Sequence, residues 1–105
     1  MAKILDLTAF KAELFELKLL DGTTIYLRKP TQAIFMQFLG FQSFDKSDPK
    51  AVLGVLRDMV LAILNTNTAG RKFAAEDIAD YDFGIMQAIV QGYSEFINEV
   101  MGDPN

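Results

Sequence analysis

The sequence predicts an α+β fold that is mainly α, with an N-terminal β-hairpin followed by three to four helices in one small domain, residues 1–105. Three observations support this prediction. Apolar and polar residues alternate on both sides of Asp21 and Gly22, Thr31 and Asp48 are typical helix starts, and later segments carry apolar residues at helical spacing. A chain of 105 residues that is 50% hydrophobic is long enough to bury one core.

The hairpin is expected over about residues 14–29. Its apolar residues occupy alternate positions on each side of Asp21-Gly22, where glycine readily adopts the positive φ of a tight turn. The predicted apolar face consists of Phe15, Leu17, Leu19, Ile25 and Leu27. Two strands alone are marginally stable in water, so this face must pack on helices or on another sheet. The preceding segment, residues 4–13, fits either a short strand or a helical turn.

Four helical segments are expected after the hairpin, at about residues 32–42, 48–65, 75–80 and 83–101. Thr31 is expected to cap the first helix, Asp48 the second, and Asp80 or Asp82 the last. Pro49 would occupy the first position of the second helix, where its missing N–H costs nothing. Apolar residues surround more than half of this second helix, so we expect it to be central in the fold.

Four phenylalanines follow one another at intervals of three residues in the first predicted helix and just beyond it: Phe35, Phe38, Phe41 and Phe44. Each step of three residues falls about 60° short of a full turn, so the rings spread over about 180° of the helix. One neighbouring element covers roughly 100°, which leaves some rings for a second neighbour. We expect Phe38 in the core and Phe41 or Phe44 partly exposed.

Two interpretations of this apolar surface stay open at the level of sequence. A compact core could absorb most of the rings, or partner chains could cover some of them, since aromatic and Met side chains adapt well to irregular surfaces. On the second interpretation, the predicted partner-binding residues are Phe35, Phe41, Phe44, Met59 and Leu61.

The composition offers little for catalysis. The chain has no His and no Cys, which removes imidazole and thiolate chemistry, disulfides and thiolate metal sites. Glu95 and Glu99 lie one helical turn apart and are interpreted as an exposed acidic ridge. The acids between Asp77 and Asp82 lack the spacing of a calcium loop, and the isolated glycines form no phosphate-binding loop. We predict a non-enzymatic protein without catalytic, cofactor-binding or metal-binding residues.

The net charge of −4 is unevenly distributed. Residues 75–105 carry seven acidic and no basic side chains, whereas residues 31–74 carry five basic and three acidic ones. The acidic end disfavours nucleic acid as a partner. Arg57 and Asp58 interrupt the longest apolar run and the start lacks a signal peptide, so we predict no membrane association and a cytoplasmic protein. Head-to-tail contacts between copies would match opposite charges, which predicts self-association.

Three segments in this order resemble one protein family. "ILDLTAF", then "LKLLDGTTIYLRKPT", then "YDFGIMQAIVQGYSEFINEV" are similar to the tail assembly chaperones of long-tailed bacteriophages and of prophages in Gram-positive bacteria. The resemblance covers the whole chain in length and order. It is strongest in the hairpin with its Lys29-Pro30-Thr31 exit and in the last helix, whereas residues 32–70 match only as apolar helix.

The resemblance implies a non-enzymatic function in the host cytoplasm. Proteins of this family bind the long, helical, aggregation-prone tape measure protein and keep it soluble while tail tube protein polymerises around it. The chaperone then leaves and is absent from the mature virion. Many members also exist as a longer product of programmed ribosomal frameshifting, whose extension recruits tail tube protein. The present chain would correspond to the short form.

Two other functional classes fit the same lack of chemistry. One is a small regulatory protein-interaction module, such as an anti-repressor or an inhibitor of a host enzyme. The other is a carrier of small apolar ligands, which would need an enclosed cavity. Genes for a tail tube protein upstream and a very long coiled-coil protein downstream would favour the chaperone.

Overall fold

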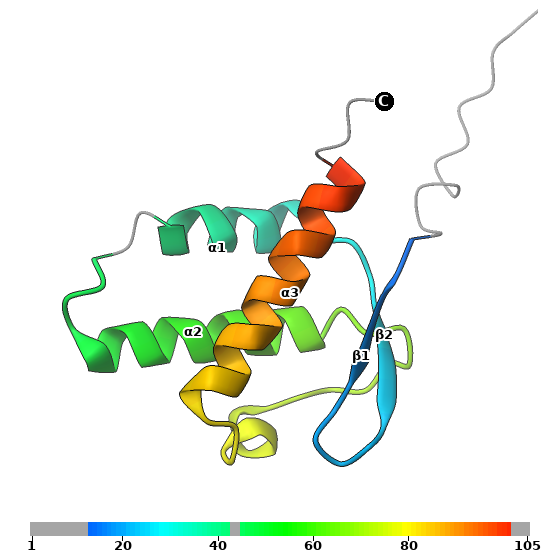
Figure 1. The fold of residues 1–105 in the computed structure, drawn as a ribbon, viewed down its shortest axis with the longest axis horizontal. Helices are drawn as coiled ribbons and strands as arrows, with labels where there is room; N and C mark the ends of the chain where they lie inside the picture. Colours follow the sequence, from blue (N-terminus) through cyan, green and yellow to red (C-terminus); the bar gives the residue numbers. More distant parts are fainter. Residues whose placement is uncertain (1–12, 43–44, 102–105) are drawn as a thin grey trace, which may run out of the picture.

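A computed structural model describes residues 13–42 and 45–101 of the chain (Figure 1). The strands are β1 (Phe15–Lys18) and β2 (Thr24–Leu27), and the helices are α1 (Gln32–Gln42), α2 (Pro49–Leu64), a short 3₁₀ helix η2 (Ala75–Ile78) and α3 (Phe83–Met101). The predicted α+β class, with a hairpin preceding the helices, is confirmed. Within the described ranges the helical part consists of three α-helices and one 3₁₀ turn.

The hairpin has one apolar and one polar face, as predicted. β1 and β2 pair antiparallel, with Phe15 opposite Leu27 and Leu17 opposite Ile25, so these four side chains share a face. The opposite face carries four exposed side chains, Glu16, Lys18, Thr24 and Tyr26. Gly22 supplies the positive φ, 88°, that the turn requires. The apolar face lies against α3, where the Phe15 ring centroid is 5.5 Å from that of Phe96.

A short segment after α2 covers the outer edge of β2. The Arg28 N–H donates to the Thr66 carbonyl at 3.2 Å, and the Thr68 N–H donates to the Tyr26 carbonyl at 2.9 Å. Asn67, between these two residues, forms a single antiparallel bridge with Leu27. β2 therefore has a backbone partner on both sides. β1 pairs with β2 alone among the described residues.

The helix starts follow the predicted capping residues. Thr31 Oγ1 accepts a hydrogen bond from the Ile34 N–H at 3.3 Å, and Asp48 Oδ1 accepts one from the Lys50 N–H at 3.1 Å. At α3 the acceptor is Asp82, whose Oδ1 lies 2.8 Å from the Ile85 nitrogen. Of the two aspartates left open by the sequence, Asp82 is the cap. Each side chain satisfies a backbone donor that a helix start leaves without a partner.

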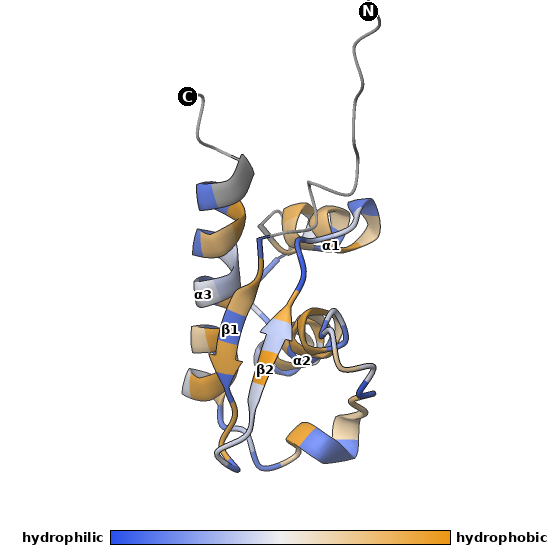
Figure 2. Cartoon of the chain, turned by 90° about the vertical axis from the view of Figure 1, so that its right-hand side faces the viewer, coloured by the Kyte–Doolittle hydropathy of each residue, from blue (hydrophilic) through white to orange (hydrophobic). Residues whose placement is uncertain are grey.

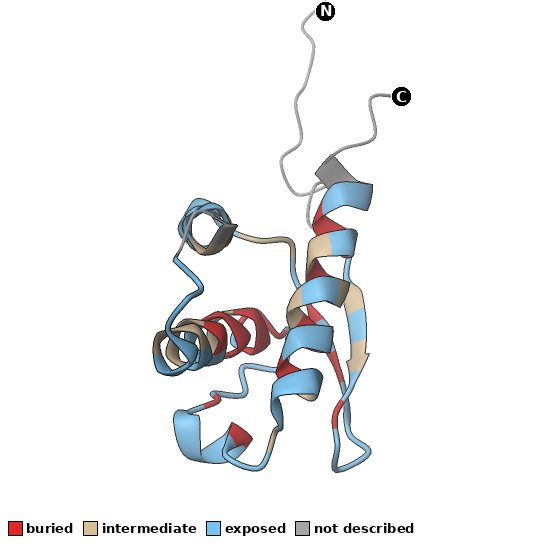
Figure 3. Ribbon diagram, turned by 60° about the vertical axis from the view of Figure 1, so that its left-hand side comes forward, coloured by how far each residue is buried: buried red, intermediate tan, exposed pale blue. Residues whose placement is uncertain are grey.

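The core lies where α2, α3 and the hairpin meet (Figure 3). α2 packs against both α1 and α3, which confirms its predicted central position. Tyr93 of α3 is fully buried, and its ring centroid lies 6.2 Å from that of Phe15 and 6.0 Å from that of Phe38 on α1. Its hydroxyl donates a hydrogen bond to the Arg28 carbonyl at the end of β2. Tyr93 thus connects α3 with both α1 and the hairpin.

Candidate partner-binding surfaces

The structure separates the five predicted partner-binding residues. Phe35, Phe41 and Leu61 are half-buried and pack against the core. Met59 is only 2% exposed, so it belongs to the core and contributes no surface. The physical reason is that α2 has neighbours on two sides, α1 and α3, which together cover a wider apolar stripe than one neighbour would. Phe44 lies outside the described residues.

The phenylalanines of α1 lie as the sequence predicts, with Phe38 in the core and Phe41 partly exposed. Phe38 is 7% exposed, as expected, and Phe35 and Phe41 flank it on the same side of the helix. The three rings spread over about 120°, since two steps of three residues lose about 60° each. Lys46 adds a further contact, with Nζ 5.0 Å from the centroid of the Phe41 ring. The core therefore accounts for much of the aromatic surface.

Two other residues supply the exposed apolar surface of α1. Met36 is 65% exposed and Leu39 is 45% exposed. The helix α1 is hydrophobic along most of its length (Figure 2). The spacing of the phenylalanines does not point to these two residues. In a helical projection of Gln32–Gln42, Met36 lies about 160° from Phe38, whereas Leu39 lies about 100° from Phe38 and borders Phe35.

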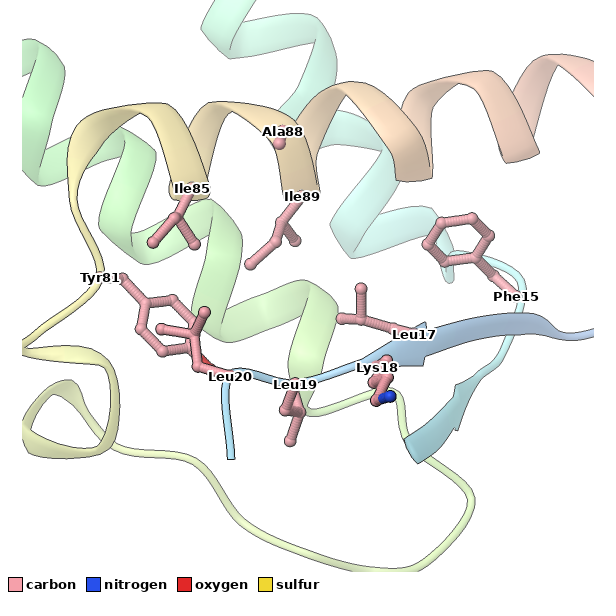
Figure 4. A pocket seen from close by; sticks show the side chains of 9 residues that line it. All are labelled: Phe15, Leu17, Lys18, Leu19, Leu20, Tyr81, Ile85, Ala88 and Ile89. Atoms are coloured by element: carbon pink, nitrogen blue, oxygen red, sulfur yellow. The ribbon is translucent and has the colours of Figure 1, made fainter. Parts of the chain in front are cut away.

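A second apolar surface is a groove of about 230 Å³ between β1 and the N-terminal half of α3 (Figure 4). Its lining residues are Phe15, Leu17, Lys18, Leu19, Leu20, Tyr81, Ile85, Ala88 and Ile89. Lys18 is the one charged side chain among them. In Figure 4, Leu17 points from β1 toward α3, and Ile85 and Ile89 point back from α3 toward the strand. The groove is open to solvent and does not have the enclosed form that a carrier of small ligands needs.

The titratable groups with altered pKa values have structural explanations. Burial raises the pKa of the Tyr93 hydroxyl to about 12, and burial also raises the pKa of Tyr81. A hydrogen bond from the Thr23 backbone lowers the pKa of Asp21, and one from the Ser47 backbone lowers the pKa of Asp45. These groups lie in turns or in the core. Their pKa values change mainly through burial and local hydrogen bonds, and not through a cluster of reactive side chains.

Residues 13–42 and 45–101 contain no group of three or more His, Cys, Asp or Glu side chains that could hold a metal ion. None of their helices combines the length and the apolar character needed to cross a membrane.

No protein-family model, curated protein sequence or solved structure matches this chain. The function is therefore inferred from the motifs of the sequence and from the two apolar surfaces.

Proposed function

We propose that the protein is a non-enzymatic tail assembly chaperone of a long-tailed phage or prophage. It would bind the tape measure protein in the host cytoplasm, keep it soluble during tail tube assembly and be absent from the mature virion. A longer frameshifted product would recruit tail tube protein. The proposal combines the resemblance of the hairpin and last helix to this family with one structural observation, the exposed apolar side of α1.

The exposed side of α1 has the properties needed to bind a helical client. Met36 is flexible and polarizable and is the most exposed large apolar residue of the described chain, at 65%. Leu39 lies one turn further along the same helix, so the two side chains form a short apolar strip. An amphipathic client helix can bury its own apolar face against such a strip.

The rest of the molecule favours solubility of the complex. The net charge is −4, and residues 75–105 carry seven acidic side chains and no basic ones. Glu95 and Glu99 are exposed on α3. Excess charge of one sign limits aggregation of a protein that carries an apolar client.

Co-expression with the candidate tape measure protein tests the proposal. We expect the tape measure protein to be soluble with this chain and insoluble without it. The double variant Met36→Ser, Leu39→Ser should lose most of this effect and remain folded, because both side chains are largely exposed. A matched control is Phe83→Ser, which removes a 50% exposed apolar side chain from the start of α3.

The possible outcomes test the proposed function and the proposed binding surface separately. A tape measure protein that stays insoluble with the wild-type chain would contradict the proposed function and favour a regulatory interaction module instead. A client that is solubilised equally by the wild type and by the α1 double variant would contradict the assignment of the surface to α1. Circular dichroism of each variant checks that the fold is intact.

A further inference from the structure

The outer edge of β1 carries backbone groups without a partner among the described residues. The Leu19 N–H donates to the Thr23 carbonyl at 2.7 Å, which makes Leu19 and Thr23 a hydrogen-bonded pair. In an antiparallel hairpin such pairs alternate with non-hydrogen-bonded ones. The register therefore directs the N–H and C=O groups of Glu16 and Lys18 away from β2. An edge of this kind is a template for another strand.

The apolar side chains of β1 also lack the cover that those of β2 have. Leu27 is fully buried and Ile25 is 4% exposed, whereas their partners across the hairpin, Phe15 and Leu17, are only half-buried. The difference arises on the side where the groove between β1 and α3 opens (Figure 4). A strand added at this edge would cover apolar surface and satisfy backbone groups at the same time.

We propose that two copies of the chain pair through β1, antiparallel and related by a two-fold axis at Leu17. In this register Glu16 of each copy lies opposite Lys18 of the other, and both pairs are hydrogen-bonded pairs. Opposite charges placed directly across a strand pair are stabilising. An isologous contact of this kind closes on itself as a dimer.

The neighbouring antiparallel registers are unfavourable, which is why the sequence selects this one. A shift by two residues in one direction places Glu16 opposite Glu16 of the other copy, and a shift in the other direction places Lys18 opposite Lys18. Like charges directly opposite each other are destabilising. A shift by one residue would turn inward-facing backbone groups toward the other copy, and no hydrogen-bonded ladder would form.

The same register matches the side chains beyond the central pairs. On the inner face it places Phe15 opposite Leu19 of the other copy, next to the groove. The register also brings Leu14, 42% exposed, near Leu20 of the other copy, which is 59% exposed and lines the groove. Further out, Glu13 would approach Asp21, and both carboxylates already have cations within their own copy, at 3.2 Å for Lys29 and 3.9 Å for Arg71.

This pairing differs from the head-to-tail association that the charge distribution predicts. Head-to-tail contacts would form open chains between the acidic C-terminal third and the basic middle of the next copy, whereas the β1 pairing stops at two copies. The β1 pairing does not rest on the proposed chaperone function, since it concerns a different surface from α1. If the chain is a monomer that still solubilises the tape measure protein, the β1 pairing is wrong and the proposed chaperone function stands.

Charge-reversal variants and sedimentation velocity test the proposal. Glu16→Lys gives two opposed pairs of like positive charge, and Lys18→Glu gives two of like negative charge. Each variant alone should raise the dimer dissociation constant about tenfold or more, from two pairs that change sign. An equimolar mixture of the two variants should regain the dimer, because every opposed pair is again of opposite sign. The double variant Glu16→Lys, Lys18→Glu should also dimerise.

Three results would overturn the pairing. The first is a wild-type chain that remains monomeric at millimolar concentration. The second is a mixture that associates no better than either variant alone. The third is a loss of association in Glu95→Lys, a matched reversal on the exposed side of α3, without a loss in Glu16→Lys, which would assign the contact to the acidic end instead.

Discussion

The two strands of the hairpin both alternate inward apolar side chains with exposed ones, but their surroundings differ. β2 has β1 on one side and the segment Thr66–Thr68 on the other, and its inward side chains Ile25 and Leu27 are buried. β1 pairs with β2 alone among the described residues, and its inward side chains Phe15 and Leu17 are half-buried. The hairpin therefore has a structural strand and an edge strand, and the edge strand lies beside an apolar groove.

The same alternation of apolar residues therefore indicates different degrees of burial in the two strands of one hairpin. In β2 it marks the core. In β1 it marks a surface that is half covered within the chain, and polar Glu16 and Lys18 on the outer face protect the edge from unselective pairing. Substitutions in β2 should therefore affect mainly the stability of the fold, and substitutions in β1 mainly the association of two copies.

Truncation of the buried strand should have the largest effect. Leu27→Ala should lower the free energy of unfolding by about 2–5 kcal/mol, because the fully buried side chain leaves a cavity. Leu17→Ala, across the hairpin, should cost about half as much since its site is half open. Urea unfolding of dilute protein measures both values. Equal losses would contradict the distinction between the strands.

Alkaline pH should weaken the contact between α3 and the end of β2. The pKa of Tyr93 is raised from 10.0 to about 12, so its contribution is complete below pH 10 and is lost as the pH rises toward 12. The loss should be about 2–3 kcal/mol. The slope of unfolding free energy against pH between 10 and 12 measures it. Tyr93→Phe should flatten this slope, and an unchanged slope in that variant would contradict the assignment.

Removal of the Asn67 side chain should uncover β2. Asn67 is 3% exposed, and its amide donates to the Leu64 and Arg71 carbonyls at 2.8 and 2.6 Å. Its Oδ1 accepts from the Ala69 and Arg71 nitrogens. Asn67→Ala leaves these groups without partners, which should cost about 1–3 kcal/mol. Thr68→Ala, an exposed neighbour, serves as the control in thermal unfolding, and equal stability of the two variants would refute the role of Asn67.

Charge reversal on β1 should have the smallest effect on stability. Glu16→Lys and Lys18→Asp alter exposed side chains and should change the free energy of unfolding of dilute protein by about 0.5 kcal/mol or less. Both should nevertheless weaken association. A large loss of stability in either variant would show that β1 is held in the fold as firmly as β2.

The positions of the helices and of the hairpin turn could be predicted from the sequence, because the local signals agree with the tertiary packing. Thr31, Asp48 and Asp82 are side-chain caps, and Gly22 lies where the turn needs a positive φ. The helix α1 spans the predicted residues, and α2 and η2 differ from their predicted bounds by one or two residues. Such signals act over three or four residues and can be read without knowledge of the fold.

The sequence was less informative about which apolar residues are exposed. Met59 was predicted at a partner surface and is buried, because exposure depends on how many neighbours α2 has. Met36 and Leu39 were overlooked although they are exposed. The segment Thr66–Thr68 had only the features of a loop, and its pairing with β2 depends on contacts between residues about 40 positions apart, which hydrophobic periodicity does not report.

Amide hydrogen exchange at two protein concentrations tests the difference between the strands most directly. In dilute protein we predict slow exchange for the Arg28 and Thr68 amides, which donate to backbone carbonyls, and fast exchange for the Glu16 and Lys18 amides. At high concentration the Glu16 and Lys18 amides should become protected while Arg28 and Thr68 stay unchanged. Protection of Glu16 and Lys18 that does not depend on concentration would contradict the account, because it would place their hydrogen-bond partner within the same chain.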